Sequence, residues 1–153
     1  MTDELPVITL KVIGSVRNKV KDSPPGASAW WVELVSEIVI DPALSEALDG
    51  LEDFSHIIVL FWMHRVTGVE IPLKVHPMLR QELPLTGIFA TRAPVRPNRI
   101  GVTAVRLLER QGNILRVKGL DALDGSPVID IKPYIPVADT VADARVPRWV
   151  PTQ

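Results

Sequence analysis

The stretch VTAVRLLERQGNILRVKG, from Val102 to Gly119, decides the fold class of this chain. Two runs rich in aliphatic and β-branched residues, Val102–Glu109 and Ile114–Gly119, flank a short polar segment. This pattern predicts two antiparallel strands, and Gln111-Gly112-Asn113 has the composition of a three-residue hairpin loop. Strands that follow one another without intervening long helices are typical of a mainly β protein.

Six further short segments have the same character, so the chain is predicted to contain about eight strands, with consecutive strands pairing antiparallel. These segments are Val7–Val16, Trp30–Ile40, His56–His64, Pro72–His76, Gly87–Ala90 and Val128–Lys132. The dipeptide Asp124-Gly125 predicts a turn before the last strand. One short helix is predicted over Pro42–Leu48, because Asp41 is a good N-cap and Gly50 follows its end. We expect a single domain over residues 1–153, built as a closed or nearly closed β-barrel with short connecting helices, since closure removes exposed strand edges.

The composition favours an ordered domain with its own core. The chain has 153 residues, of which 46% are apolar, and a compact fold of this length removes roughly 70% of the unfolded surface from water. It has no cysteine, which excludes disulfides, thiolate metal sites and cysteine nucleophiles. The three histidines lack a further ligand at suitable spacing, so we expect no metal site. The longest apolar run, Ile57–Met63, is too short to cross a membrane, and the first residues carry no basic stretch, so we expect a cytoplasmic protein without a membrane partner.

The net charge of −1 hides an uneven distribution of charge. Residues 80–118 hold eight basic side chains against two acidic ones, a net charge of +6, while residues 23–79 hold two basic against eight acidic ones, a net charge of −6. One interpretation is that these charges pair with each other on the folded surface. The other is that the arginines bind phosphate or carboxylate groups, since the guanidinium fork suits such anions.

Two loops carry groups that a purely structural role explains poorly. In Gly87–Gly101, GIFATRAPVRPNRIG, rigid prolines alternate with arginines, an arrangement expected of a preorganised anion or nucleotide site. In Lys118–Pro136, Asp130, Lys132 and Tyr134 are spaced by two on a predicted strand and therefore point to one face. Such a row is either functional or a solvent-facing stripe. The sequence contains no dinucleotide-binding GxGxxG after its first strand, no Walker loop, no GxSxG and no HExxH motif.

In these stretches the chain resembles the TsaA-like family, also called TrmO, of S-adenosylmethionine-dependent tRNA methyltransferases. The similar stretches occur in the same order over nearly the whole chain: IGSVRN (13–18), Ala47–His64, Gly87–Gly101 and Leu120–Pro136. One departure is Arg99, which stands where the family usually has a proline. The chain resembles a short form, without the additional C-terminal domain of longer members.

The resemblance implies a β-barrel that binds S-adenosylmethionine without a Rossmann fold, commonly as a homodimer. It also implies an acceptor, threonylcarbamoyladenosine beside the tRNA anticodon, which is methylated on its exocyclic nitrogen. Carried over position by position, the implied cofactor contacts are Pro25, Gly26, Ala27, His64, Arg65, Arg92, Val102, Lys118, Gly119, Leu120 and Asp121.

Roles within this framework are our inference. Asp130 and Tyr134 are candidates for polarising the acceptor nitrogen, with Lys132 tuning their pKa or holding a substrate carboxylate. A second set, Arg96, Asn98 and Arg99, is predicted to contact anticodon-loop phosphates or the threonyl carboxylate.

Two features leave the assembly and the acceptor open. Trp30 and Trp31 are adjacent on a predicted strand, so their side chains must point to opposite faces; one would lie outside the barrel and mark a homodimer interface near the cofactor loops. Two alternatives to tRNA methylation remain: a methyltransferase that acts on a small molecule, and a non-catalytic S-adenosylmethionine-binding module.

Overall fold

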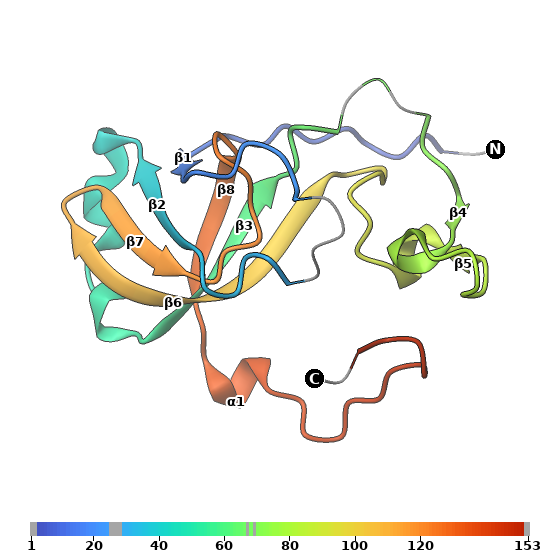
Figure 1. Ribbon diagram of the computed structural model, residues 1–153. Coiled ribbons are helices and arrows are strands. Elements are labelled where there is room, and N and C mark those ends of the chain that lie inside the picture. Colours follow the sequence, from blue (N-terminus) through green and yellow to red (C-terminus); the bar gives the residue numbers. More distant parts are fainter. Residues whose placement is uncertain (1–2, 25–28, 67, 69, 152–153) are drawn as a thin grey trace.

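The structure, a computed structural model, describes residues 3–24, 29–66, 68 and 70–151. Its main body is a barrel, beside which an arm containing β4 and β5 extends to one side, while the C-terminal segment with α1 runs below (Figure 1). The functional site is defined by the way the arm and the barrel meet.

Six antiparallel strands close into a barrel in the order β1-β2-β7-β6-β3-β8. Their bounds are β1 Gly14–Arg17, β2 Val35–Ile40, β3 His56–Trp62, β6 Ile100–Gln111, β7 Ile114–Lys118 and β8 Pro127–Pro133. Each strand has a neighbour on both sides, so the barrel has no open edge. The prediction of a mainly β fold with a closed barrel is confirmed.

The pairing of strands is only partly consecutive. β1 pairs with β2, and β6 with β7, as predicted; Gln111 lies opposite Ile114, so the hairpin loop has two residues instead of three. However, β7 also pairs with β2, while β3 pairs with β6 and β8. The prediction that β7 and β8 pair is therefore wrong. Residues 119–126 instead cross from one wall of the barrel to another, at the end where the site lies.

Burial alternates along the strands, and the inward side chains form the core. In β3, Ile57, Val59 and Phe61 point inward and are buried, while the residues between them face outward and are half-buried. Leu115 and Val117 of β7 complete the same core, and neither is exposed to solvent. Burial of each such side chain contributes roughly 1.5–3 kcal/mol, and in β7 these residues alternate with the charged Arg116 and Lys118, which specifies the face that turns inward.

One end of the barrel is closed by short 3-10 helices, η1 Pro42–Leu48 and η2 Leu51–Asp53. Asp41 caps η1 as predicted, with its carboxylate accepting a hydrogen bond of 3.0 Å from the Ala43 amide. Leu48 is buried, and Leu44 and Leu51 pack against the core. Apolar side chains therefore cover this end of the core.

The arm contains β4 Lys74–Val75, η3 Pro77–Leu79, β5 Thr86–Gly87 and η4 Ile88–Ala90. β4 and β5 form a separate two-stranded sheet. The prediction of a strand over Gly87–Ala90 is wrong beyond Gly87, because the Thr91 amide and hydroxyl both donate to the Ile88 carbonyl and close a helical turn.

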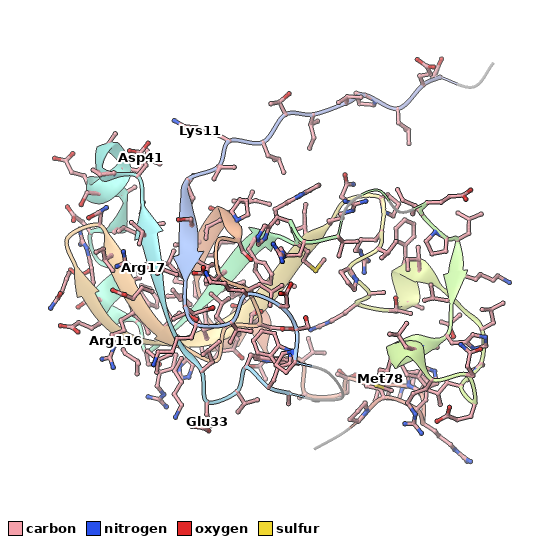
Figure 2. The ribbon with its side chains drawn as sticks, turned by 45° about the horizontal axis from the view of Figure 1, so that its top comes forward. Lys11, Arg17, Glu33, Asp41, Met78 and Arg116 are labelled. Atoms are coloured by element: carbon pink, nitrogen blue, oxygen red, sulfur yellow. The ribbon has the colours of Figure 1, made fainter. Side chains whose placement is uncertain are left out.

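Two predicted strands are shorter than the sequence suggested. Residues 3–13 are extended but belong to no strand, and Lys11 in this segment points away from the barrel (Figure 2). Trp30 and Trp31 lie in a turn before β2, where the Leu34 amide donates to the Trp31 carbonyl at 3.0 Å. The prediction that these tryptophans occupy opposite faces of a strand is therefore wrong.

A short helix, α1 Pro136–Asp139, follows β8. In the described part of the chain, no helix has the length and apolar character needed to cross a membrane.

Candidate functional site

A cavity of about 980 Å³ lies at the open end of the barrel, opposite η1. At this end β1, β3 and β7 finish and β2, β6 and β8 begin, so the three connections between them, 18–34, 63–99 and 119–126, can contribute side chains. The arm supplies the remaining wall through Met78 and Phe89. The other lining residues include Asp22, Trp30, Trp31, His64, Arg65, Arg92, Arg96, Val102, Asp121 and Ser126.

The floor of the cavity depends on a glycine in the Gly87–Gly101 motif. A Cβ on Gly101 would lie 2.4 Å from the Phe61 ring, which is closer than any real contact. Both residues line the cavity, and Phe61 is buried. Gly101 thus allows an aromatic ring of the core to form the cavity floor.

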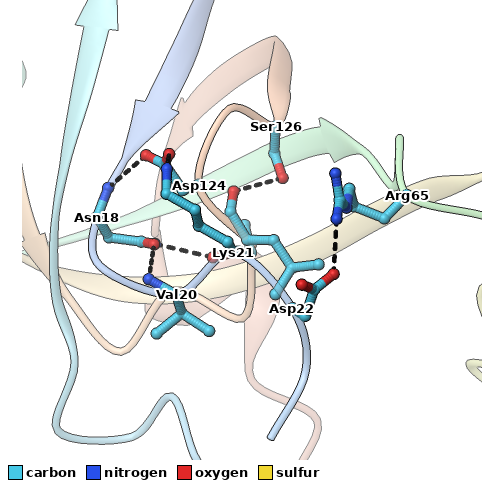
Figure 3. A network of polar contacts seen from close by, with 9 residues as sticks. Asn18, Val20, Lys21, Asp22, Arg65, Asp124 and Ser126 are labelled. Carbon is cyan, nitrogen blue, oxygen red and sulfur yellow. Dashed lines mark hydrogen bonds and ion pairs between the residues drawn. The ribbon is translucent and has the colours of Figure 1, made fainter.

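The crossover segment 119–126 presents one carboxylate to the cavity. Leu120 and Ala122 are buried in the core, so Asp121 between them faces the other side, where it lines the cavity. Asn18 fixes this backbone by donating from its side chain to the Ala122 carbonyl at 2.9 Å. The backbone amide of Asn18 donates to the Asp124 carboxylate at 3.0 Å (Figure 3). Asp121 is therefore held by an ordered segment.

The two carboxyl groups of this segment have opposite environments. Burial raises the pKa of the Asp121 carboxyl from 3.8 to about 6. The Asp124 carboxylate receives hydrogen bonds from Lys21, at 2.8 Å, and from the Asn18 amide, and these lower its pKa. Asp124 is an ionised structural group, whereas Asp121 is a carboxyl that titrates near neutral pH inside a cavity.

His64 is oriented by Ser126, the last residue of the crossover before β8. The buried Ser126 hydroxyl donates to the Leu123 carbonyl at 2.7 Å, so its oxygen can accept the longer hydrogen bond of 3.4 Å from His64 Nδ1. This arrangement assigns the proton of the neutral imidazole to Nδ1 and leaves Nε2 as an acceptor.

The arginines of the site differ in what they already bind. Arg65 forms an ion pair of 2.7 Å with Asp22 (Figure 3). Arg96 donates to the carbonyls of Thr91 and Ala93 at 2.9 and 3.3 Å. Arg92 is exposed at the cavity wall and forms no ion pair with any residue that the structure describes. It is the guanidinium most available to an anionic ligand.

Arg99, which stands in place of the usual proline, lies outside the cavity and donates to the Val66 carbonyl. The Met63 amide in turn donates to the Arg99 carbonyl at 2.8 Å. Arg99 therefore ties the loop before β6 to the segment after β3.

The structure brings six of the predicted site residues together in the cavity: His64, Arg65, Arg92, Arg96, Val102 and Asp121. Others lie next to it in the chain but do not line it. Leu120 is part of the core, and Lys118 forms an ion pair of 2.6 Å with Glu33. Gly119 adopts a left-handed conformation with φ of 96°, which begins the crossover, and Asn98 is exposed in the loop before β6. Pro25, Gly26 and Ala27 lie outside the described residues.

Asp130, Lys132 and Tyr134 do not line the cavity. Asp130 and Lys132 lie opposite Leu60 and Ile58 on the outer wall and form an exposed ion pair of 3.0 Å. Tyr134 lies beside His56, at the other end of β3, and its hydroxyl is 3.0 Å from that of Thr140. Within a single chain, Asp130, Lys132 and Tyr134 therefore lie apart from the residues that line the cavity.

Aromatic residues of the cavity were missed by the sequence interpretation. Trp30 and Trp31 pack edge to face with ring centroids 5.6 Å apart, and both line the cavity together with Phe89. The signal was their position directly after a loop rich in proline and glycine, which argues for a loop aromatic instead of a strand residue. No group of three or more histidine and acidic side chains suited to a metal ion occurs among the described residues.

The fold and the site together define a closed β-barrel with a ligand cavity at one end. A family profile described as the tRNA-methyltransferase O N-terminal domain matches residues 13–140. The chain therefore belongs to this family, and the resemblance seen in the sequence is confirmed.

Similar proteins carry related names. A probable S-adenosyl-L-methionine-binding protein of Methanothermobacter thermautotrophicus is 48% identical over 136 residues, covering 88% of this chain and 95% of the relative. A probable S-adenosyl-L-methionine-binding protein of Pyrococcus abyssi is 44% identical over 135 residues, covering 88% of this chain and 71% of the relative. The mouse tRNA (adenine(37)-N6)-methyltransferase is 44% identical over 100 residues, covering 65% of this chain but only 23% of its own length.

Solved structures agree with the fold. The crystal structure of TrmO from Pseudomonas aeruginosa superposes with a TM-score of 0.71 at 35% identity, and 92% of this chain is covered. Another TrmO crystal structure gives a TM-score of 0.72 at 36% identity. The chain spans 62% and 64% of these solved chains, respectively.

Proposed function

We propose that this chain is an S-adenosylmethionine-dependent methyltransferase that methylates the exocyclic nitrogen of threonylcarbamoyladenosine beside the tRNA anticodon. The observation that carries the proposal is the cavity at the open end of the barrel, which gathers around one space an arginine without an ion pair to any described residue, a carboxyl group and aromatic rings. Membership of the tRNA-methyltransferase O N-terminal domain family supports the same activity.

The residues of the cavity fit the proposed cofactor. Its volume of about 980 Å³ lies at the upper end of the range of roughly 300–1,000 Å³ that is usual for small-molecule sites. Arg92 suits the methionyl carboxylate, since a guanidinium can bind both carboxylate oxygens. The aromatic rings of Trp30 and Trp31 suit the faces of purines. When bound, the cofactor supplies an electrophilic methyl group on a sulfonium centre.

The chain's own residues must orient the acceptor and manage a proton. The acceptor nitrogen is ureido-like, and its lone pair is delocalised into the carbonyl group and the purine, so it is a weak nucleophile while it carries its proton. A base positioned beside it contributes roughly 10²–10⁴-fold to the rate, and holding the reactants in line contributes further.

The loop before β6 is proposed to receive the acceptor. Arg96 reaches the cavity while it braces its own loop through the Thr91 and Ala93 carbonyls, so its guanidinium is preorganised. Asn98 and Arg99 lie further along the same loop, and the proposal assigns them contacts with anticodon-loop phosphates or the threonyl carboxylate. The proposed tRNA contact therefore adjoins the cofactor cavity.

A homodimer is proposed on new grounds. The arm carries large apolar side chains in solvent: Leu73 is 83% exposed, Leu79 92% and Phe89 77%. Exposed apolar residues that cluster on one extension are typical of an interface, and Phe89 also lines the cavity. Sedimentation is expected to give a dimer at micromolar concentration and a monomer for Leu79→Asp; a monomeric wild-type protein would remove this proposal.

Asp130, Lys132 and Tyr134 keep their predicted role only if a second copy turns this row toward a cavity. Within one chain, their distance from the cavity leaves them outside the proposed site. Loss of turnover in Asp130→Asn in the dimer would support the predicted role, and retained turnover would remove it.

One observation favours a small molecule as the alternative acceptor. Three of the eight basic side chains in 80–118 are neutralised within the chain: Arg80 pairs with Glu82, Arg110 with Asp49 and Glu52, and Lys118 with Glu33. The surface left for RNA is smaller than the sequence suggested.

The test of the proposed function is incubation of the protein with labelled S-adenosylmethionine and tRNA prepared from cells with and without the threonylcarbamoyl modification. Label is expected only in the modified tRNA. Binding of the cofactor without transfer to either tRNA would exclude tRNA methylation and leave the small-molecule enzyme or the non-catalytic module.

A further inference from the structure

The two carboxyl groups in the crossover, those of Asp121 and Asp124, differ in their hydrogen bonds to the described residues. Asp124 binds Lys21 and the Asn18 amide and thereby fastens the loop after β1 to the crossover. Asp121 accepts no hydrogen bond from any residue that the structure describes, although it is half-buried between two core residues. Partial removal of a carboxyl group from water without a hydrogen-bond partner is unfavourable, and such groups are often retained where a function requires them.

We propose that Asp121 is the catalytic residue that accepts the proton of the acceptor nitrogen during methyl transfer. This inference rests on the proposed function and assigns its missing base. It differs from the sequence-based expectation in two ways, because Asp121 was expected to contact the cofactor, and the base was expected among Asp130 and Tyr134.

The step balances in atoms and charge. The nitrogen lone pair forms the new N–C bond with the methyl carbon, while the C–S bond breaks and its electron pair remains on sulfur. The N–H proton passes to an oxygen of the Asp121 carboxylate, which later releases it to water. A sulfonium cation and a carboxylate anion are thereby converted into two neutral groups. A partly desolvated cavity favours such a step, because it stabilises neutral groups relative to charged ones.

The setting of Asp121 suits a base at neutral pH. Its carboxyl pKa of about 6 lies close to the working pH, so the carboxylate predominates and still binds a proton well. The charged or titratable groups that share the cavity come from three elements: Asp22 after β1, His64 and Arg65 after β3, and Arg92 and Arg96 before β6. Asp22 and Arg65 neutralise each other in an ion pair.

His64 is the competing base in the same cavity. Its Nε2 is available as an acceptor, whereas Nδ1 is directed at Ser126. An imidazole that accepts the proton becomes a cation, so proton transfer to His64 would leave a positive charge in the cavity, whereas transfer to the Asp121 carboxylate would not. The pH profile of each variant separates the two residues.

The first experiment measures single turnovers of the full chain with labelled S-adenosylmethionine and modified tRNA, from pH 5 to pH 9. For the wild type, the rate is expected to rise with pH and to level off as the Asp121 carboxyl ionises. Asp121→Asn is expected to lower the single-turnover rate constant by roughly 10²–10⁴-fold and to lose this dependence on pH, with cofactor affinity changed by less than about threefold. Asp53→Asn, an exposed carboxylate on η2 outside the cavity, is the matched control and is expected to behave as the wild type.

The second experiment needs no turnover. Carboxyl NMR follows the titration of Asp121 in the wild-type protein with S-adenosylmethionine and with S-adenosylhomocysteine, which differ by the methyl group and the positive charge. If Asp121 faces the reacting centre, its pKa is expected to be lower by about one unit or more with the charged ligand. Equal pKa values would place Asp121 away from that centre and overturn the proposal.

Three other outcomes overturn the proposal. One is full turnover by Asp121→Asn. Another is a tenfold or greater loss of cofactor affinity in this variant with an unchanged pH profile, which would make Asp121 a cofactor contact only. The third is loss of the pH dependence in His64→Gln or Asp130→Asn instead. If the wild type binds the cofactor but methylates no tRNA, the proposed function fails, and the assignment of Asp121 as the base fails with it. If the wild type does methylate tRNA and any of the three outcomes is found, only the assignment of Asp121 is rejected.

Discussion

Replacing Asp121 with asparagine is expected to stabilise the protein at neutral pH. Burial raises the pKa of this carboxyl from 3.8 to about 6, so the folded state binds its proton more tightly than the unfolded state does. The contribution of such a group to stability is fully present below the unfolded-state pKa and is lost as pH rises through about 6. Asparagine has a similar shape and no charge, so this loss is absent from the variant.

The size of the effect follows from the shift. A shift of one pKa unit corresponds to about 1.4 kcal/mol, and a rise of roughly two units therefore gives an upper bound of about 3 kcal/mol. The Asp121 side chain keeps partial access to water, which screens its charge. We therefore expect Asp121→Asn to increase the free energy of unfolding at pH 8 by about 1–2 kcal/mol, and by much less at pH 4.

Urea unfolding of both proteins between pH 4 and pH 8 measures this difference. Asp124→Asn provides a matched control of opposite sign, because hydrogen bonds from Lys21 and the Asn18 amide lower the pKa of Asp124. Its stabilisation is present above the unfolded-state pKa and is lost as pH falls, so this variant is expected to be less stable than the wild type at pH 8. A gain for Asp121→Asn that does not change with pH, or a loss at pH 8, would refute the argument from desolvation.

Further predictions concern the cofactor site, the cavity floor and RNA binding. Arg92→Ala is expected to weaken S-adenosylmethionine binding by about 10- to 100-fold in calorimetry, because the ligand carboxylate loses its partner; unchanged affinity would remove Arg92 from the site. Gly101→Ala is expected to lower the free energy of unfolding by about 1–3 kcal/mol, since its Cβ would meet the Phe61 ring, and urea unfolding equal to wild type would contradict that contact. If Arg96 and Arg99 are the two guanidinium groups that reach phosphates, the affinity for an anticodon stem-loop should fall with salt at a log–log slope of about −1.4, whereas a slope near −3 would require further basic contacts.

The sequence predicted the barrel well where each strand has one buried face. In β7, Leu115 and Val117 alternate with Arg116 and Lys118, and this pattern reports the core directly because the inward positions must be apolar. β3 is a continuous apolar run, which predicts a buried strand but not which of its faces turns inward. The same kind of pattern misled the interpretation at residues 7–13 and 88–90. Val7, Ile8, Leu10 and Val12 are exposed, and no strand in the described part of the chain pairs with residues 7–12. In the second segment Phe89 is exposed and Ile88 is buried, but η4 turns the backbone out of the strand. Local hydrophobicity therefore identifies candidate strands but not whether a neighbour exists.

The site was predicted in part, for a similar reason. Residues at strand ends, such as His64, Arg92 and Asp121, come together because the barrel gathers these ends at one opening. Spacing by two correctly put Asp130 and Lys132 on one face, but it does not say whether that face turns toward the site. The direction of that face is decided by an irregularity in the pairing of β3 with β8: Leu60 lies opposite Asp130, but Phe61 lies opposite Val128. This shift depends on the neighbouring strand and so cannot be predicted from the spacing within β8. Trp30 and Trp31 were missed because aromatic residues have the same preference for strands as for ligand sites.

S-adenosylmethionine is proposed to bind in the cavity at the open end of the barrel, and NMR of isotope-labelled protein during titration with the cofactor tests this. We expect the signals of Asp121, His64 and Arg92 and the indole N–H groups of Trp30 and Trp31 to shift together and to saturate at one equivalent per chain. Shifts confined to the outer-wall residues Asp130 and Lys132, or no shift at all, would contradict it.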